Sequence, residues 1–446
     1  MPIPEGLRTA LNEIRETSIV SDTLYHRYID EIEPTTDIGS WASPILTNPQ
    51  VMNEFFNVLI QRIVYTQVNV KLYNNPLQIL EGDRMPLGSI GQEIAINPIK
   101  ARKFNVDDFA GLLAKYEADV KVQYMHLNSD LQYCVTVTRA KVVDAFTSWD
   151  SLNQFIDGIT NSLYNGAYID HYRMSKDLVS AAYAGNNVQL EIITSPLTSA
   201  DYAKAFIKKA REIYMNMQFP TSRFNAWNKV GGYGRELLTW ARPEDIVILL
   251  RTDVAAQVDL EVLASAFNMS KADLIGRIVY VDNFDIYDGD EKVFDGSAIY
   301  AFMGDKSWFR IKQREMTMDE FYNANNRTWQ FYLNDVRMYA YSLFADGVVF
   351  ASSLPDVKAT GIEFLGESSF EIEEGAEKIV KVALTPPNAT SETTFTSATP
   401  AVVKVTKISD TEVKVEGVDA DATAVTITAT NNSHTDTISV KCVAAS

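Results

Sequence analysis

The sequence predicts an α+β body followed by a small all-β domain. Composition changes sharply near Leu354-Pro355, because residues 361–446 contain no Trp, Tyr, Arg or Met whereas the preceding body is rich in aromatic residues. Within the body, segments with helical spacing are interspersed with segments of alternating or continuous apolar residues. Beyond the boundary only short alternating segments remain, separated by turn formers, which is typical of a β sandwich.

Length and charge limit the class of protein. The chain has 446 residues, of which 46% are hydrophobic, enough to bury cores in two or three domains. Its 58 acidic and 40 basic residues give a formal net charge of -18, which repels phosphate and disfavours a dedicated nucleic-acid binder. The N-terminal segment lacks an apolar signal core, so we expect a globular protein folded in a cytoplasm. The two cysteines, Cys134 and Cys442, are expected to be free, buried thiols.

The first hundred residues are predicted to form an arm, a helix and a hairpin. Asn48-Pro49 has the pattern of an N-cap followed by proline at the first helical position. The helix that follows places Phe55 at helical spacing with later apolar residues. The next segment alternates like two strands around the turn formers Glu81-Gly82-Asp83, and its prolines suit an edge or a projecting arm. We therefore predict a long hairpin that extends from the body.

The segment from Lys141 to Tyr183 is predicted to be one long amphipathic helix. Its apolar residues recur at steps of three and four, and the predicted buried stripe consists of Phe146, Trp149, Leu152, Ile156, Ile159 and Leu163. Roughly 40 helical residues would span about 60 Å, which suits an elongated subunit better than a spherical one. Gly158 and Gly166 suggest close backbone packing. Two ordinary helices with a break remain the alternative.

The second half of the body alternates between helix-like and strand-like segments. Between Thr194 and Asn323, helix-like stretches such as ADYAKAFIKKAREIYMNM alternate with apolar runs such as DIVILL, which predicts an α/β unit. The following aromatic-rich segment, FYLNDVRMYAYSLFADGVVFASS, returns to strand periodicity. We expect it to pair with earlier strands of the body.

Searches for chemical motifs assign no catalytic, cofactor-binding or metal-binding residue. The patterns of P-loops, nucleophile elbows and zinc proteases do not occur, and the four histidines form no i,i+4 pair. The acidic loop DNFDIYDGDEKVFDG does not fit the spacing of a calcium loop. A carboxylate pair able to hydrolyse a glycoside stays an open alternative, because 58 acidic residues contain some pair that could meet in space.

One segment has the pattern of a DNA-reading helix-turn-helix. In Asp259 to Val281, Leu260, Leu263 and Ala264 give a helical stripe before a turn. The second helix would run only from Lys271 to Ile275, which is too short and too poor in basic residues to read bases. We predict a helix, turn and strand that build a domain and do not bind DNA.

Several segments of the body resemble the major capsid protein of the small short-tailed phages typified by phi29. The matching segments are LYNNPLQILEGDRMPLGSIGQEI (72–94), AFTSWDSLNQFIDGITNSLYN (145–165), DLEVLASAFNM (259–269) and DKSWFRI (305–311), which occur in the family's order. The NNPL and MPLG elements are specific in combination. The tail, EEGAEKIVKVALTPPNATSETTFTSATPAVVKV, resembles a bacterial Ig-like domain of group 2.

The resemblance implies the tailed-phage capsid fold that encapsulins share. The implied regions are an N-terminal arm and helix (1–69), an extended loop (70–100), a peripheral domain with a spine helix (101–195, completed by 324–355), an axial domain (196–323) and a C-terminal Ig-like sandwich (356–446). The stripe from Phe146 to Leu163 corresponds to the spine helix. The extended loop would contact neighbouring subunits, and the candidate contact residues are Pro76, Leu77, Glu81, Asp83, Arg84, Pro86 and Leu87.

The implied function is a structural shell subunit without enzymatic activity or cofactor. Copies would assemble in the host cytoplasm, as hexamers and pentamers, into the icosahedral or prolate shell of the virion. The implied partners are other copies of the chain, a scaffolding protein, a portal and double-stranded DNA that is enclosed without sequence-specific binding. The Ig-like domain would contact glycans on the host surface. Two alternatives are an exported adhesin with an Ig-like module, which would need a signal peptide, and a glycan-active enzyme with an Ig-like accessory domain.

Overall fold

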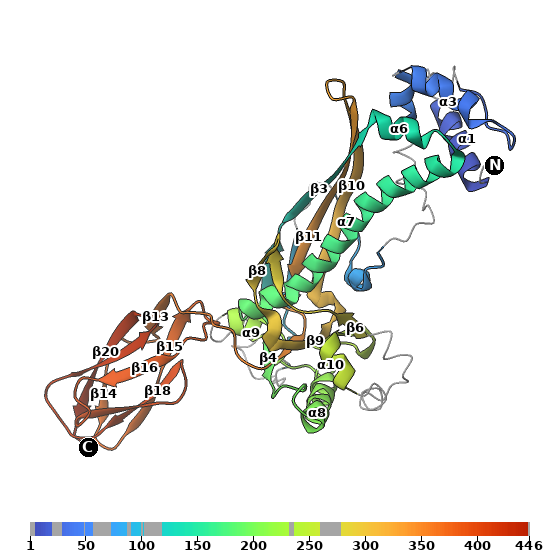
Figure 1. Ribbon diagram of the computed structural model, residues 1–446. Coiled ribbons are helices and arrows are strands. Elements are labelled where there is room, and N and C mark those ends of the chain that lie inside the picture. Colours follow the sequence, from blue (N-terminus) through green and yellow to red (C-terminus); the bar gives the residue numbers. More distant parts are fainter. Residues whose placement is uncertain are drawn as a thin grey trace, which may run out of the picture. The chain divides into compact units, whose positions relative to one another are not determined.

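The computed structural model describes most of the chain as two compact units (Figure 1). The described residues are 5–19, 29–48, 50–56, 73–86, 91–99, 101, 118–231, 236–258 and 278–444. The first unit comprises Met1–Ile90, Met125–Ser175 and Ile311–Tyr339, and the second comprises Gly91–Tyr124, Lys176–Arg310 and Ala340–Ser446. Both units therefore draw on segments that are far apart in the sequence.

The first unit combines helices with a three-stranded sheet. Its elements are α1 (Glu5–Ile19), α3 (Ile38–Thr47), a helix over 50–56, the 3-10 helix η1 (Pro76–Leu80), β3 (Ser129–Thr138), α6 (Arg139–Ala145), α7 (Trp149–Ala184), β10 (Phe309–Asn323) and β11 (Thr328–Tyr341). The strand order is β10-β11-β3, and β11 is antiparallel to β3. The late strand β11 is thus the central strand, and the long helix α7 runs alongside the three strands (Figure 1).

The long amphipathic segment is divided into two helices. The C-cap of α6 is Phe146, and α7 begins at Trp149. Ser148 separates them, because its hydroxyl oxygen accepts a hydrogen bond of 3.1 Å from the Ser151 N–H and thereby caps α7. From there α7 continues without interruption for 36 residues, about 54 Å at the rise of an α-helix. The expected single helix from Lys141 is therefore wrong at its start.

The two glycines of this helix have different environments. A Cβ at Gly166 would lie 3.2 Å from the Tyr133 ring on β3, so the predicted close packing is found there. A Cβ at Gly158 would meet nothing within 4 Å, so the same expectation is wrong for Gly158.

The core of the first unit is rich in aromatic residues. All six residues of the predicted stripe, Phe146, Trp149, Leu152, Ile156, Ile159 and Leu163, are at most 7% exposed and belong to this core. Trp41 of α3 contacts Phe146 and Trp149, with ring centroids 6.0 and 5.1 Å apart. Phe56 contacts Trp329 and Phe331 of β11. The N-terminal helices, α7 and the central strand thus share one core.

The second unit contains a five-stranded mixed sheet. Its first group of elements is β1 (Gly91–Ile96), β2 (Val120–Met125), β4 (Gln189–Ile192), α8 (Ala200–Asn216), α9 (Trp227–Val230), η2 (Pro243–Asp245), β5 (Ile246–Arg251), α10 (Thr252–Gln257), β6 (Ile278–Val281), β7 (Ile286–Asp288), β8 (Glu291–Phe294), η3 (Gly296–Ala298), β9 (Ile299–Asp305), η4 (Lys306–Trp308) and β12 (Gly347–Ala351). The strand order is β4-β12-β9-β5-β6. Pairing is antiparallel at β12/β9 and β5/β9 and parallel at β12/β4 and β5/β6.

This sheet matches the α/β unit predicted from the sequence, with two added strands. The fully buried pattern of β5 explains its continuous apolar run, IVILLR. Helix α8 packs one apolar stripe, including Phe206 and Ile213, onto the sheet. β12 supplies Phe350 to the same core, so the last segment of the body pairs with earlier strands as predicted.

The C-terminal residues form a β sandwich. Its strands are β13 (Gly361–Phe364), β14 (Ser369–Glu373), β15 (Glu377–Thr385), β16 (Thr393–Ser397), β17 (Val403–Lys407), β18 (Glu412–Gly417), β19 (Val425–Asn431) and β20 (His434–Val443). The two four-stranded sheets have the orders β13-β15-β18-β17 and β14-β20-β19-β16. Val380, Val415, Ile427 and Val440 from both sheets share one core. The predicted all-β tail is therefore confirmed as a β sandwich with a core of its own.

The cysteines, the segment from Asp259 to Val281 and the acidic loop have different outcomes. Cys442 is buried as expected, whereas Cys134 is exposed because it lies on the outward face of β3. Most of the expected helix-turn-strand segment, residues 259–277, lies outside the described residues, which resume at β6. The acidic loop forms the β7/β8 hairpin, in which Lys292 bridges Asp285 and Asp295.

No described helix has the length and apolarity needed to cross a bilayer.

Candidate functional site

Residues 73–86, which belong to the segment predicted to project as a hairpin, pack within the first unit. Pro76 begins the 3-10 helix η1, and the Asn75 Oδ1 atom accepts a hydrogen bond of 2.9 Å from the Leu77 N–H. This cap and the proline favour a short helical turn over a strand. Leu77 and Leu80 are almost completely buried. The apolar residues of this segment therefore face their own subunit.

The expected turn at Glu81-Gly82-Asp83 pairs with β10 instead of reversing into a second strand. Glu81 forms a parallel bridge with Ile311, and the Gly82 N–H donates a hydrogen bond of 2.8 Å to the Ile311 carbonyl. The Met85 N–H donates a hydrogen bond of 2.9 Å to the Gln313 carbonyl. The strand β1 pairs with β2. The predicted hairpin around these residues is therefore wrong.

The seven candidate contact residues differ in their environments. Leu77 is buried and Glu81 is engaged in an ion pair within the first unit. The exposed candidates are Pro76, Asp83, Arg84 and Pro86. Leu87 lies outside the described residues. Contact of the four exposed residues with a neighbouring subunit stays a prediction.

Glu81 belongs to a buried ionic network that sequence reasoning missed. The Arg337 guanidinium on β11 contacts the Asp335 Oδ2 atom through Nε and the Glu81 Oε1 atom through Nη1, both at 2.6 Å. The side chains of Arg337 and Asp335 are each 5% exposed, and that of Glu81 is 19% exposed. Because one guanidinium serves two carboxylates, the network joins the 73–86 segment to the central strand.

A neutral histidine completes this network. His171 of α7 is 2% exposed, and its Nδ1 atom lies 2.9 Å from the Tyr339 hydroxyl. Burial and, secondarily, the charge of Arg337 lower the pKa of His171 to about 3. The contact of 3.7 Å between its Nε2 atom and Glu81 is therefore between a neutral ring and a carboxylate. The charges of Arg337, Asp335 and Glu81 pair with one another, which suits a structural role better than a catalytic one.

A signal for this network exists in the sequence, although it is weak. Asp335 and Arg337 are two residues apart in a strand and therefore lie on the same face. Their position on a face that otherwise carries Trp329, Phe331 and Leu333 could have indicated a buried pair. Their partner Glu81, more than 250 residues earlier, could not be identified from spacing.

The two-stranded ribbon of β1 and β2 carries exposed apolar side chains. Ile94 and Ile96 of β1 are 55% and 59% exposed, and Val120 and Tyr124 of β2 are 50% and 64% exposed. Large exposed apolar side chains on one ribbon are candidates for an interaction surface. The described part of the chain contains no group of three or more His, Cys, Asp or Glu side chains suited to hold a metal ion. The exposed side chains of this ribbon and the ionic network around Arg337 are the candidate functional features.

Most of the chain resembles known proteins. A family model described as Phi29-like phage major capsid protein matches residues 18–351. The major capsid protein of Bacillus phage PZA is 26% identical over 343 residues, which cover 77% of this chain and 72% of that protein. The major capsid protein of Streptococcus phage Cp-1 is 25% identical over 303 residues, which cover 66% of this chain and 80% of that protein.

A solved structure supports the same assignment at the level of the fold. The capsid structure of Staphylococcus phage Andhra matches with a TM-score of 0.52 and 14% sequence identity, covering 65% of this chain and 88% of that chain. The mixed α and β architecture described above is therefore that of a phage capsid subunit. Because the family model spans most of the residues before the C-terminal sandwich, the chain belongs to the Phi29-like phage major capsid protein family.

Proposed function

We propose that this chain is the major capsid protein that forms the head shell of a phi29-like virion. The observation that carries the proposal is the family match over residues 18–351, which includes α7 and the β10-β11-β3 sheet. The ionic joint around Arg337 supports a structural role, because its charged groups are paired within the subunit. The same match favours a shell subunit over an adhesin or a glycan-active enzyme.

In this proposal the subunits assemble as hexamers and pentamers, with a scaffolding protein and a portal, around double-stranded DNA. The net charge of -18 is consistent with a container that encloses DNA without binding it tightly, because strong attraction would hinder packaging and release. Pro76, Asp83, Arg84 and Pro86 are the exposed candidates for contacts between subunits.

We further propose that the C-terminal sandwich is an Ig-like module on the outer surface of the shell. It has its own core, so it contributes little to the core of the rest of the chain. Residues 361–446 contain thirteen acidic residues and six lysines, a surface better suited to solvent than to a DNA-filled interior. Glycans of the host surface are the ligand class that the Ig-like resemblance favours.

Electron microscopy of the purified protein tests the main proposal. The full chain, expressed with the assembly partner that it requires, should give closed shells or capsomer rings. A preparation that contains only dispersed monomers under these conditions contradicts the proposed function.

A further inference from the structure

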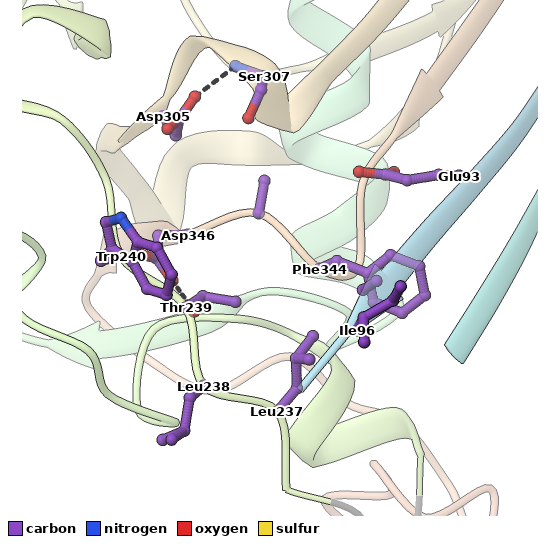
Figure 2. Close-up of a pocket in the computed structure, with 12 residues that line it drawn as sticks. Glu93, Ile96, Leu237, Leu238, Thr239, Trp240, Asp305, Ser307, Phe344 and Asp346 are labelled. Atoms are coloured by element: carbon purple, nitrogen blue, oxygen red, sulfur yellow. Dashed lines mark hydrogen bonds between the residues drawn. The ribbon is translucent and has the colours of Figure 1, made fainter. Parts of the chain in front are cut away.

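An acidic cleft in the second unit has a composition that points to a specific kind of occupant (Figure 2). Its volume is about 290 Å³, which suits one long side chain better than a large ligand. The residues that line it are Glu93, Ala95, Ile96, Leu237, Leu238, Thr239, Trp240, Asp305, Ser307, Phe344, Ala345 and Asp346. They come from β1, the segment before η2, the β9 to η4 junction and the segment before β12.

Hydrogen bonds fix the walls of the cleft before any ligand binds. The Asn97 side chain, at the end of β1, accepts a hydrogen bond of 3.0 Å from the Leu238 N–H and donates to the Glu236 carbonyl. The Asn225 amide donates to the Leu237 carbonyl and the Thr239 hydroxyl, at 2.9 and 3.0 Å. Since these bonds hold the 236–239 segment in place, binding would require little ordering of the wall.

The floor of the cleft holds a buried carboxyl group with unused hydrogen-bonding capacity. Asp346 is 2% exposed, and its Oδ1 atom accepts a hydrogen bond from the Thr239 hydroxyl (Figure 2). Its Oδ2 atom is buried and has no hydrogen-bond partner among the described residues. Burial and, in addition, the negative charge of Asp305 raise the pKa of Asp346 to about 7. A buried carboxyl oxygen without a donor favours a ligand that supplies one.

The remaining lining residues restrict the ligand to a cation with an apolar stem. Asp305 adds a second acidic side chain, and Glu93 a third, which is paired with Arg310. Trp240 is 54% exposed and lines the same cleft as Asp346. Carboxylates favour a cation, and an indole face binds a guanidinium or ammonium group well. An anion would be repelled, and an apolar group would leave the Asp346 oxygen unpaired.

The exposed apolar residues beside the cleft indicate that the cation belongs to another protein surface. Ile96 lines the cleft and is 59% exposed, and Ile94 on the same face of β1 is 55% exposed. A free amino acid would leave these side chains in water, whereas a docked subunit would bury them together with Trp240. Tryptophan and arginine are also the residues that most often dominate such contacts. In a shell built from one kind of chain, every subunit has copies of the same chain as neighbours. A second copy can therefore supply this surface at every position.

We propose that this cleft receives an arginine or lysine side chain from a second copy of the chain, with the cationic group bound by Asp346 and stacked on Trp240. The proposal rests on the proposed shell function. Because each copy carries a net charge of -18, a basic side chain in an acidic cleft would also offset part of the repulsion between neighbours.

The first test uses matched charge variants of the full chain. Asp346→Asn keeps an acceptor for Thr239 but presents an amide to the cation, so the subunit concentration needed for assembly should rise about 10-fold or more. Asp288→Asn, which removes the same charge from an exposed position on β7, should leave that concentration unchanged. Circular dichroism of the unassembled variants establishes that each is folded. Folded Asp346→Asn subunits that assemble like Asp288→Asn overturn the proposal.

The second test needs no change at the carboxyl group. Of the six tryptophans, Trp240 is the one that is more than half exposed, so acrylamide quenching of the unassembled subunit mainly reports on it. Assembly should protect this fluorescence, and Trp240→Phe should abolish the difference between subunits and shells. Shells with undiminished quenching overturn the inference but not the proposed function. If a scaffolding protein protects the Trp240 fluorescence before any capsomer forms, the cleft binds that partner, and the inference is also overturned. Failure of the unmodified chain to form any shell contradicts the proposed function itself.

Discussion

Replacing Arg337 by leucine removes the guanidinium that balances two buried carboxylates in the first unit. Asp335 and Glu81, which are 5% and 19% exposed, would then share a buried site without a cation. Loss of one partner from a buried ion pair typically costs about 3–5 kcal/mol, because the remaining charge is still desolvated. We therefore expect Arg337→Leu to lower the free energy of unfolding of the subunit by about 3–5 kcal/mol.

The assay is urea unfolding of the unassembled subunit, with two matched variants. Arg337→Lys keeps the charge but loses the forked geometry, so an intermediate loss is expected. Arg173→Ala removes a guanidinium that is 62% exposed and paired with Asp170 on the same helix, and should cost less than about 1 kcal/mol.

The pH dependence separates an electrostatic loss from a loss of packing. In Arg337→Leu the loss comes from two buried negative charges without a cation, so it should be smaller at low pH, where protons can neutralise such charges. The deficit relative to the unmodified chain should therefore be larger at pH 7 than at pH 5. A variant within about 1 kcal/mol of the unmodified chain, or a deficit independent of pH, would refute the electrostatic role of Arg337.

Three further predictions concern other parts of the chain. Ile159→Asp places a carboxylate in the aromatic core and should lower the free energy of unfolding by about 3 kcal/mol or more. Gln154→Ala, on the exposed face of α7, should change it by less than about 0.5 kcal/mol. Equal melting temperatures of the two variants would contradict the orientation of the helix. The pKa of His171 is about 3 in the folded state, whereas a histidine in the unfolded chain binds a proton below about pH 6.5, so the free energy of unfolding should fall by about 2 kcal/mol between pH 7 and pH 5. His171→Gln should remove this fall, and the exposed control His126→Gln should not. Parallel pH profiles for the two variants would contradict the assignment to His171. Residues 357–446 expressed alone should show a β-rich circular dichroism spectrum and melt cooperatively, while the chain without them still forms shells; failure of both contradicts a separate module.

Periodicity predicted the elements that are long and have one buried face. The stripe from Phe146 to Leu163 could be predicted because apolar residues at steps of three and four are typical of one face of a helix. The strands of the tail could be predicted for a similar reason, since their residues alternate regularly between turn formers. In both cases the information lies within a short window of sequence.

Features that depend on one side chain or on partners far away in the sequence could not be predicted. Ser148 has the polarity expected on the outer face of a helix, and only its hydrogen bond to Ser151 identifies it as a cap. The residues around Glu81 contain turn formers and prolines, and their pairing with β10 depends on residues more than 200 positions later. The acidic cleft is built from four separated segments, so neither its shape nor the burial of Asp346 could be inferred from spacing.

The central position of β11 also affects the order in which the protein can fold during synthesis. Phe56 finds its ring partners Trp329 and Phe331 about 270 residues later, which at roughly 5–20 residues per second means about 15–55 s on the ribosome. During that time the apolar side chains near the N-terminus lack the strand that covers them. Contacts of such high sequence separation also slow folding. The nascent subunit should therefore depend on chaperones until β11 has emerged, and shell assembly before that point would trap an unfinished core.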